Sequence, residues 1–461
     1  CEARAGGGAS FVITLPRWRR PARRSASGGA ASLESRPMFR TRLARHAAAF
    51  WGFVVYMPVG VNYAAFLFLM IAMSVGGNWR ERAQRVRSNP LFWPIVAYLA
   101  WTLIVLAIRP HYGKETGTEF FHAVRIAVTV LLALALSREE CIWALRAFLL
   151  VSVISLGLIV LHHLGVLPDA QIWRAVVSIQ GNKSINDALL FATIGAAAAV
   201  LGMAHLGDAR RWHWAGPAFA VTALMVAVVS LALPSRTSLL AMLACIFAAC
   251  FHQYRSHRLG LAASLAVAVL IAGVGVWQLP QSIKARFAAG IHEVEQASAG
   301  LESEDSWVTR YYMYKLTGEM MLDAPVAGLG IGAWTPEWKK RAPPVIQYKN
   351  MPHNDYLWIG SQAGIPGFAA LLAIVLAGIW ASWKRPDMTG RIGFVAMLTL
   401  LMGSSFNSGM RDAQIGLSLL LIALLCLRLV QERGSPWQAV LPPRLSGLLR
   451  SDDPKAGGTL L

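Results

Sequence analysis

Long apolar runs recur along this chain, and they constrain its fold more than any other feature. An α-helix of about 20 apolar residues is long enough to span the hydrocarbon core of a bilayer. With 56% hydrophobic residues and a mean hydropathy of +0.48, the chain has more apolar sequence than one soluble core can bury. We therefore predict an all-α polytopic integral membrane protein with about 12 transmembrane helices. The predicted spans are residues 47–59, 60–76, 90–108, 121–136, 141–163, 186–206, 213–233, 237–252, 258–279, 355–381, 391–408 and 412–430.

The distribution of arginine and lysine predicts the orientation, because cytoplasmic loops carry an excess of these residues. If residues 47–76 form a hairpin broken near Pro58, the main basic clusters fall on one side, and both termini are cytoplasmic. A single long helix over 47–76 would instead export the arginine-rich N-terminus. The clusters are residues 1–46, Arg80 to Arg87, Arg210 and Arg211, Arg255 and Arg258, Lys384 to Arg391, and the C-terminal segment. The net charge of +19 therefore indicates topology and contact with anionic lipid, in preference to nucleic-acid binding.

The same topology places the only long loop on the outer face, which is the periplasm in a Gram-negative cell. We expect this loop to be partly helical, with a helix near residues 305–322 and a Pro/Gly segment after it. Its aromatic residues are expected either to stack on sugar rings or to pack together. The predicted organisation is a basic, disordered cytoplasmic segment at 1–46, transmembrane helices 1–9 at 47–279, the periplasmic loop at 280–352, transmembrane helices 10–12 at 353–430, and a cytoplasmic tail at 431–461.

Several cations fall on the predicted outer side, against the topological bias, and so need another explanation. They are Arg109, Arg125, Lys183, Arg236, Arg310 and Arg411. A guanidinium offers a rigid fork of donors that matches phosphate oxygens, so several arginines converging on one cavity would suit a pyrophosphate. The alternative is an arginine that extends to lipid headgroups, which better explains Arg109 and Arg411.

His353 lies where the long loop meets a hydrophobic span, in HNDYLWIGSQAGIPG. A neutral imidazole is the natural proton acceptor near neutral pH, so this position suggests chemistry on a membrane-anchored substrate. On residue chemistry alone, a helix cap or an interfacial hydrogen bond explains His353 equally well. The five cysteines and the histidines show no metal-ligand spacing, and GLGIGAW lacks the strand and GK[ST] of a phosphate loop. We expect no metal and no cofactor.

Four segments resemble the O-antigen ligase and polymerase superfamily, and within it the O-antigen ligases of lipopolysaccharide assembly. They are SIQGNKSINDALL, LPSRTSLLAM, TRYYMYKLTGEMMLDAPVAGLGIGAW and HNDYLWIGSQAGIPG. The last matches the ligase pattern of His-Asn, nine residues, Gly, two residues, Gly. His353, Asn354, Gly364 and Gly367 carry this match.

The resemblance implies transfer of a polysaccharide from undecaprenyl pyrophosphate to a sugar hydroxyl of lipid A-core, at the periplasmic face of the bacterial inner membrane. His353 would be the general base of an inverting displacement. Arg236 and Arg310, with Arg125, would bind the pyrophosphate in place of a metal ion. Asn354, Tyr356, Asn182, Lys183 and Asn186 would be supporting or substrate-contacting residues, although Gly/Asn segments also form plain turns. Gly364 and Gly367 would permit a bend or a close helix approach.

Other functions remain open at this point. An O-antigen polymerase or a protein O-oligosaccharyltransferase of the same superfamily would share the donor and differ in the acceptor; the His-Asn spacing favours the ligase. A lipid-linked sugar flippase or transporter would explain the spans and the arginines but not the long outer loop ending in His353, and the sequence shows no convincing internal repeat. A scaffold without activity explains least.

Overall fold

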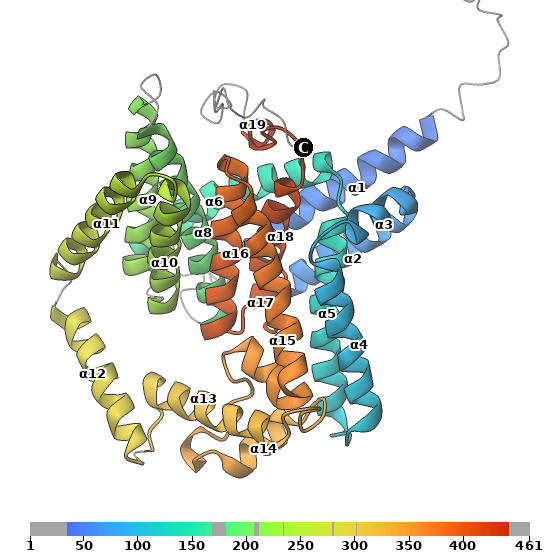
Figure 1. The fold of residues 1–461 in the computed structure, drawn as a ribbon, viewed down its shortest axis with the longest axis vertical. Coiled ribbons are helices and arrows are strands. Elements are labelled where there is room, and N and C mark those ends of the chain that lie inside the picture. The colour runs from blue at the N-terminus through green and yellow to red at the C-terminus, as the bar shows by residue number, and fades with distance from the viewer. Residues whose placement is uncertain are drawn as a thin grey trace, which may run out of the picture.

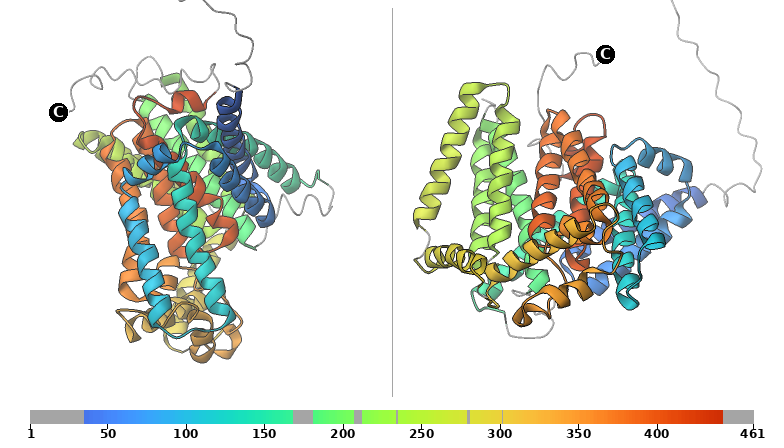
Figure 2. Two further views of the ribbon diagram at one scale, coloured as in Figure 1. Left: turned by 90° about the vertical axis from the view of Figure 1, so that its right-hand side faces the viewer. Right: turned by 60° about the horizontal axis from the view of Figure 1, so that its bottom comes forward.

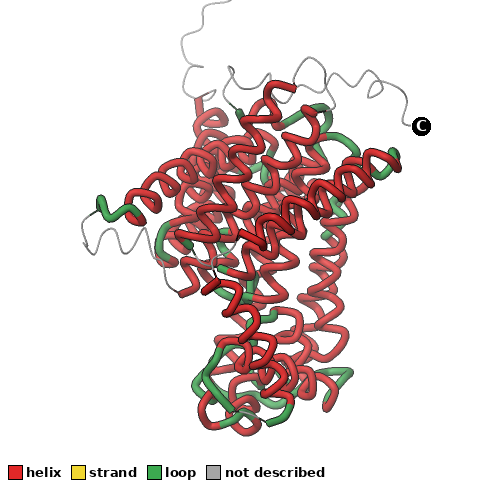
Figure 3. The backbone as a smooth tube through the Cα atoms, turned by 90° about the vertical axis from the view of Figure 1, so that its left-hand side faces the viewer, coloured by secondary structure: helices red, strands yellow, loops and turns green. Residues whose placement is uncertain are grey.

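The computed structural model describes residues 35–167, 181–206, 212–233, 235–278, 281–300 and 302–441. In these ranges every regular element is a helix, which confirms the predicted all-α fold class (Figures 1 and 3). Most of the predicted N-terminal segment and of the C-terminal tail, residues 1–34 and 442–461, lies outside the described residues.

The chain forms a bundle of long helices with a group of shorter ones across one end (Figures 1 and 2). The first half contains α1 (Ser35–Phe53), η1 (Val54–Tyr56), α2 (Val59–Gly76), α3 (Trp79–Arg87), α4 (Phe92–Ile108), α5 (Lys114–Ala135), α6 (Arg138–His163), α8 (Gly181–Leu206), η2 (Trp212–Trp214), α9 (Ala215–Ala227), η3 (Val228–Ala232), α10 (Arg236–Tyr254) and α11 (Arg258–Gln278). The second half contains α12 (Gln281–Ser298), α13 (Ser306–Asp323), α14 (Trp334–Arg341), η4 (Pro344–Ile346), α15 (Asp355–Lys384), α16 (Met388–Phe406), α17 (Ala413–Gly416), α18 (Leu419–Val430) and α19 (Trp437–Val440).

Nine helices of the described ranges are long and apolar enough to cross a membrane, and α3 with α4 makes a tenth if this bent pair counts as one span. Two predicted spans are not among them. Residues 47–59 fall in the arginine-bearing α1 and in η1. The predicted span 258–279 corresponds to α11, a 21-residue helix of apolar sequence with side chains that lie partly outside the described residues, so this span stays a prediction. The protein is therefore a polytopic membrane protein, while the count of about 12 spans stays a prediction.

Apolar side chains on the outside of the bundle are those expected to face lipid. Leu67 and Ile71 on α2, Leu103 and Ile104 on α4, and Val153 on α6 are all at least 47% exposed. By contrast, every side chain of α18 is buried. Helix α18 packs against α16, α5 and α6 and so forms the centre of the bundle.

One end of the bundle gathers basic side chains. Arg82 on α3 forms a buried ion pair with Glu140 at the start of α6, with 2.6 Å between nitrogen and oxygen, and Arg45 on α1 pairs with the adjacent Glu139. Arg146 on α6 donates to the Ala439 carbonyl of α19 at 2.6 Å. Helices α1, α3 and α19 lie at this end, and α13 and α14 lie at the other (Figure 1). That the end with α1, α3 and α19 is cytoplasmic stays a prediction.

The long loop is helical over most of its described length. The helix expected near 305–322 is observed as α13. Trp334 and Trp338 of α14 stack with their ring centroids 5.3 Å apart, and the Trp334 indole donates to Thr317 of α13 at 2.9 Å. Both tryptophans are buried with Met313 and Met320 in a small core of their own. These two aromatic residues therefore serve packing.

The glycine-rich segment 325–332 binds the kinked part of α15. Carbonyl groups of α15 accept hydrogen bonds from the backbone amides of Leu329 and Gly330 at 2.9 and 3.0 Å. Helix α15 is broken at Gly364, where φ is 72°, and the Ile365 amide beside it donates to the Pro325 carbonyl. Gly364 thus permits the bend expected there. The amides of this segment are used within the protein, so it is not a phosphate loop.

The connection between α4 and α5 holds the other side of segment 325–332. Arg109 donates through Nε to the Gly328 carbonyl at 2.6 Å, and the Tyr112 hydroxyl donates to the Leu329 carbonyl at 2.9 Å. Arg109, for which we expected headgroup contact, is therefore part of the packing between the loop and the bundle.

Replacement of Gly364 by alanine should destabilise the fold. A Cβ at this position would lie 2.5 Å from the Val326 carbonyl oxygen, and the positive φ is unfavourable for alanine, at a cost of about 1–3 kcal/mol before any clash. Thermal unfolding of the purified protein in detergent should show a lower Tm. Gly157→Ala in α6 is the matched control, because the added Cβ meets open space there. Equal Tm values for the two variants would contradict this account.

Candidate functional site

Arg236 lies in the first turn of α10. The preceding Val228–Ala232 segment is a π-helix, and the Ser235 hydroxyl caps α10 by accepting from the Ser238 amide at 3.3 Å. The N-terminus of a helix carries a partial positive charge, which adds to that of the guanidinium. This corner of the bundle is therefore strongly electropositive.

Arg310 of α13 lies beside Arg236. Burial lowers the pKa of Arg310, the nearby Tyr314 partly offsets this, and the charge of Arg236 lowers it further. The structure thus brings together two arginines that are far apart in the sequence. Like charges at close range repel each other, so the pair is best neutralised by an anion with several oxygens.

His353 has a left-handed backbone conformation, with φ at 53°, immediately before α15. Asn354 caps that helix, and its side-chain oxygen accepts from the Tyr356 and Leu357 amides at 3.0 Å each. Non-glycine residues with positive φ are uncommon and are held only where the surrounding structure requires it. Here the cap fixes the backbone, and the Tyr314 hydroxyl, which donates to Ser405 at 2.9 Å, lies 3.4 Å from the His353 carbonyl.

The imidazole of His353 is neutral at neutral pH. Burial lowers its pKa to about 4, and the positive charges of Arg310, Lys349 and Arg411 contribute in the same direction. Its Nδ1 is enclosed and has no hydrogen-bond partner in the described part of the chain. Arg310 is therefore close enough for its charge to act on both Arg236 and the neutral His353 ring.

The turn at residues 407–412 is held by buried side chains on two helices. Asp355 of α15 accepts from the backbone amides of Met410 and Arg411 at 2.6 and 3.1 Å. Arg125 of α5 donates to the carbonyl groups of the same two residues, to Met410 at 2.9 Å. The turn is thus fixed through both its donors and its acceptors.

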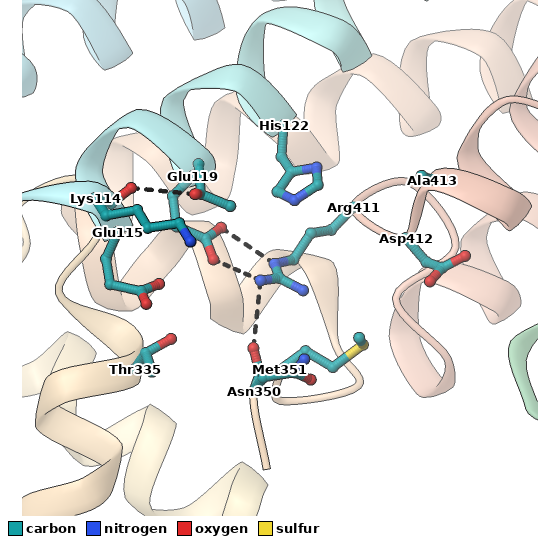
Figure 4. A pocket seen from close by; sticks show the side chains of 11 residues that line it. Lys114, Glu115, Glu119, His122, Thr335, Asn350, Met351, Arg411, Asp412 and Ala413 are labelled. Carbon is teal, nitrogen blue, oxygen red and sulfur yellow. Dashed lines mark hydrogen bonds and ion pairs between the residues drawn. The ribbon is translucent and has the colours of Figure 1, made fainter. Parts of the chain in front are cut away.

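Arg411 connects this turn to the loop before His353. Its guanidinium makes a two-pronged ion pair with Glu119 of α5 and donates to the Asn350 carbonyl at 3.3 Å (Figure 4). The indole of Trp358 also donates to Glu119, at 2.8 Å. Both partners of the ion pair are more than 90% buried, so the expected headgroup contact of Arg411 is wrong.

A cavity of about 410 Å³ opens beside Arg411 (Figure 4). It lies between the start of α5, the start of α14 and the segment leading to His353. Nine of its eleven lining residues have polar or charged side chains: the lining is Lys114, Glu115, Thr118, Glu119, His122, Thr335, Asn350, Met351, Arg411, Asp412 and Ala413. The imidazole of His122 points toward Arg411 in this view, and its Nδ1 is enclosed with no partner among the described residues. Such a lining suits a ligand rich in hydroxyl groups.

The remaining predicted site residues lie apart from His353 or inside the protein. Lys183 pairs with Asp187 within α8 at 2.7 Å, and Asn186 donates to the Val55 carbonyl at 3.1 Å. Tyr356 is buried in α15. Asn182 lies in the first turn of α8, and its side chain is outside what the structure describes. Roles of these residues in substrate binding stay predictions, as does pyrophosphate binding by the carbonyl-bound Arg125.

Several residues that shape the site were missed in the sequence. Asp355 and Tyr314 each lie near a motif residue, and a signal for Asp355 was its place two residues after His353. The indication for Glu119 in the sequence was clearer, because a carboxylate in a spanning segment is costly unless it has a partner. Apart from its charge, nothing in the sequence indicated that Lys349 lies near His353.

The fold and the site define a polytopic membrane protein with a cationic, histidine-containing site at one end of its helical bundle. Residues 221–372, about a third of the chain, match the family model described as O-antigen ligase (Wzy_C), so this part of the chain is similar to the O-antigen ligase superfamily. Members of this family are glycosyltransferase-like enzymes with lipid-linked polysaccharide substrates. The matched segment contains Arg236, Arg310 and His353. A comparison with curated protein sequences found no match.

Loss of Glu119 should be strongly destabilising, because it leaves the Arg411 guanidinium buried without its anion. We expect Glu119→Ala to cost roughly 3–5 kcal/mol of unfolding free energy. Glu119→Ala combined with Arg411→Met should recover part of this loss, since it removes both charges. Glu115→Ala, one turn earlier on α5, is the control. The measurement is Tm in detergent. A double variant no more stable than Glu119→Ala would show that the Glu119–Arg411 ion pair does not stabilise the fold in this way.

Proposed function

We propose that the protein is an O-antigen ligase. It transfers O-antigen polysaccharide from undecaprenyl pyrophosphate to a sugar hydroxyl of lipid A-core and so completes lipopolysaccharide. The reaction takes place at the periplasmic face of the inner membrane, with both termini of the protein in the cytoplasm. The observation that carries the proposal is the presence of Arg236, Arg310 and His353 inside the segment that matches the family model, with Arg310 close enough for its charge to act on the other two.

Arg236 and Arg310 bind the donor pyrophosphate. The two guanidinium groups supply several N–H donors, and the N-terminus of α10 adds its dipole. As the glycosidic bond to the phosphate breaks, its electron pair passes to the leaving pyrophosphate oxygen, where these cations stabilise the negative charge. This arrangement needs no metal ion for charge neutralisation. Arg125 contributes indirectly, through the 407–412 turn that it holds.

His353 is the general base. Its ring accepts the proton of the acceptor hydroxyl while the acceptor oxygen bonds to the anomeric carbon from the side opposite the leaving group, which inverts the configuration. A pKa of about 4 makes the free histidine a weak base. A bound pyrophosphate raises that pKa, because an opposite charge nearby favours the protonated form. Donor binding thus strengthens the base.

The acceptor sugar binds in the cavity beside Arg411. Asn350 and Met351 line this cavity and precede His353 by two or three residues, which places it next to the base. The donor and acceptor then approach from different sides, with Arg310 on one and Arg411 on the other, and both charges act on the His353 ring.

The direct test is transfer by the purified protein in detergent. The reaction contains undecaprenyl-pyrophosphate-linked polysaccharide, lipid A-core and EDTA, without ATP. We expect full-length lipopolysaccharide from the wild type, a loss of about 10²–10⁴-fold in rate for His353→Ala, and about 10²–10³-fold for Arg310→Ala. Lys315→Ala, on an exposed position one turn further along α13, is the matched control and should stay active.

Each other result identifies a different error. If the wild type lengthens the donor and ignores lipid A-core, the protein is an O-antigen polymerase. If it loads glycan onto a protein acceptor, it is an O-oligosaccharyltransferase. If EDTA abolishes transfer, the metal-free account of the leaving group is wrong. Full activity of His353→Ala would remove the base assigned here.

The acid limb of the pH profile should lie well below the ordinary histidine pKa of 6.5. The kcat/KM profile reports the free enzyme, in which the pKa of His353 is lowered to about 4. Activity therefore persists as pH falls through 6.5 and is lost only near the lowered value. Lys349→Gln removes one nearby positive charge and should move the limb to higher pH, whereas Lys339→Gln on α14 should not. A wild-type limb at 6.5 would contradict this prediction.

A further inference from the structure

Helix α3 lies across the bundle at its basic end. It contains nine residues, WRERAQRVR, and meets α4 at an angle of 91°. Gly77 and Asn78, both with positive φ, make the sharp turn that separates it from α2. A short, basic helix perpendicular to the spanning helices is placed to lie along the membrane–water interface.

Two of its four arginines fix α3 to the bundle. Arg82 is buried in a two-pronged ion pair with Glu140, with distances of 2.6 and 2.9 Å. Arg82 and Arg85 each donate to the Ala135 carbonyl at the end of α5, at 3.2 Å. These contacts hold the helix in place and satisfy its inner cations.

The other two arginines, Arg80 and Arg87, point away from these contacts. Both are exposed, and within the described residues neither has a protein partner. With Trp79, Ala83, Gln84 and Ser88 they make up one face of α3, which borders an open surface hollow of about 720 Å³. Two guanidinium groups at the mouth of one hollow suit an anion.

An adjoining cavity of about 390 Å³ shares Trp79, Ala83 and Arg87 with the first, and its floor is apolar. The floor comes from α2, α4 and α5: Met70, Met73, Phe92, Val128, Leu131 and Leu132. Trp79 and Trp93 flank the bend between α3 and α4 and are 56% and 72% exposed. Exposed tryptophans of this kind are typical of the headgroup level of a membrane. Together the two cavities offer a charged mouth above an apolar groove.

We propose that this groove binds an anionic glycerophospholipid from the surrounding leaflet. Arg80 and Arg87 contact the headgroup phosphate, and an acyl chain lies on the apolar floor between α2 and α5. Charge complementarity selects the headgroup, and the groove borders the lipid-facing side chains of α2. The site lies at the end of the bundle opposite α13 and α14, so it is independent of the proposed transfer reaction (Figure 1).

The test is lipid binding by the full-length protein in detergent, measured by native mass spectrometry with phosphatidylglycerol and phosphatidylcholine as probes. The wild type should bind phosphatidylglycerol in preference, and Arg80→Gln combined with Arg87→Gln should weaken its binding by roughly 10- to 30-fold. Lys315→Gln with Lys339→Gln removes the same charge at the opposite end and is the control. Ala83→Trp keeps every charge but fills both cavities.

Ala83→Trp should also lose phosphatidylglycerol, which separates this site from general attraction to a basic surface. A well-folded Ala83→Trp protein with wild-type affinity would overturn the proposal. Equal affinity of the wild type for the two lipids would overturn it as well, and so would equal losses in the α3 variant and in the control. Transfer activity is not the readout, so failure here leaves the ligase proposal untouched.

Discussion

The buried ion pair between Glu119 and Arg411 is the interaction on which the site depends. It links α5 to the 407–412 turn, and the same guanidinium reaches the Asn350 carbonyl just before His353. Asp355 and Arg125 bind the backbone amides and carbonyl groups of Met410 and Arg411 in the same turn. Charges taken out of water are costly unless their partners are well placed. Because the partners come from α5, α15, the loop before His353 and the 407–412 turn, the arrangement forms only when the bundle is correctly assembled.

The positive charge around His353 explains why the ring is neutral and also how it can respond to substrate. Burial and three neighbouring cations disfavour protonation in the free protein. A pyrophosphate held by Arg236 and Arg310 would cancel much of this charge and make the ring more basic. In the proposed reaction the base therefore becomes effective only once the donor is bound, which limits proton transfer without a donor. In the proposed reaction the same cations thus serve both leaving-group stabilisation and control of the base.

The fold class, the hairpin break near Pro58 and helix α13 could be predicted from the sequence, because they follow from local hydrophobicity and helix periodicity. The exact number of spans could not, since α1 is helical but carries four arginines, which are unfavourable in a span. Arg236, Arg310 and His353 were found by motif, but the proximity of Arg310 to the other two needed the fold. Arg411 was misread because its partner Glu119 lies far away in the sequence, and Asp355 was missed because its partners are backbone amides.

The most direct test of this account is the titration of His353 itself. Nuclear magnetic resonance of the protein in nanodiscs, with labelled histidine and His353→Gln to assign its signal among the 11 histidines, gives the pKa without and with undecaprenyl pyrophosphate. The account predicts a pKa near 4 in the free protein and a clear rise when the lipid binds. A pKa near 6.5 in the free protein, or one that does not respond to the lipid, would contradict it.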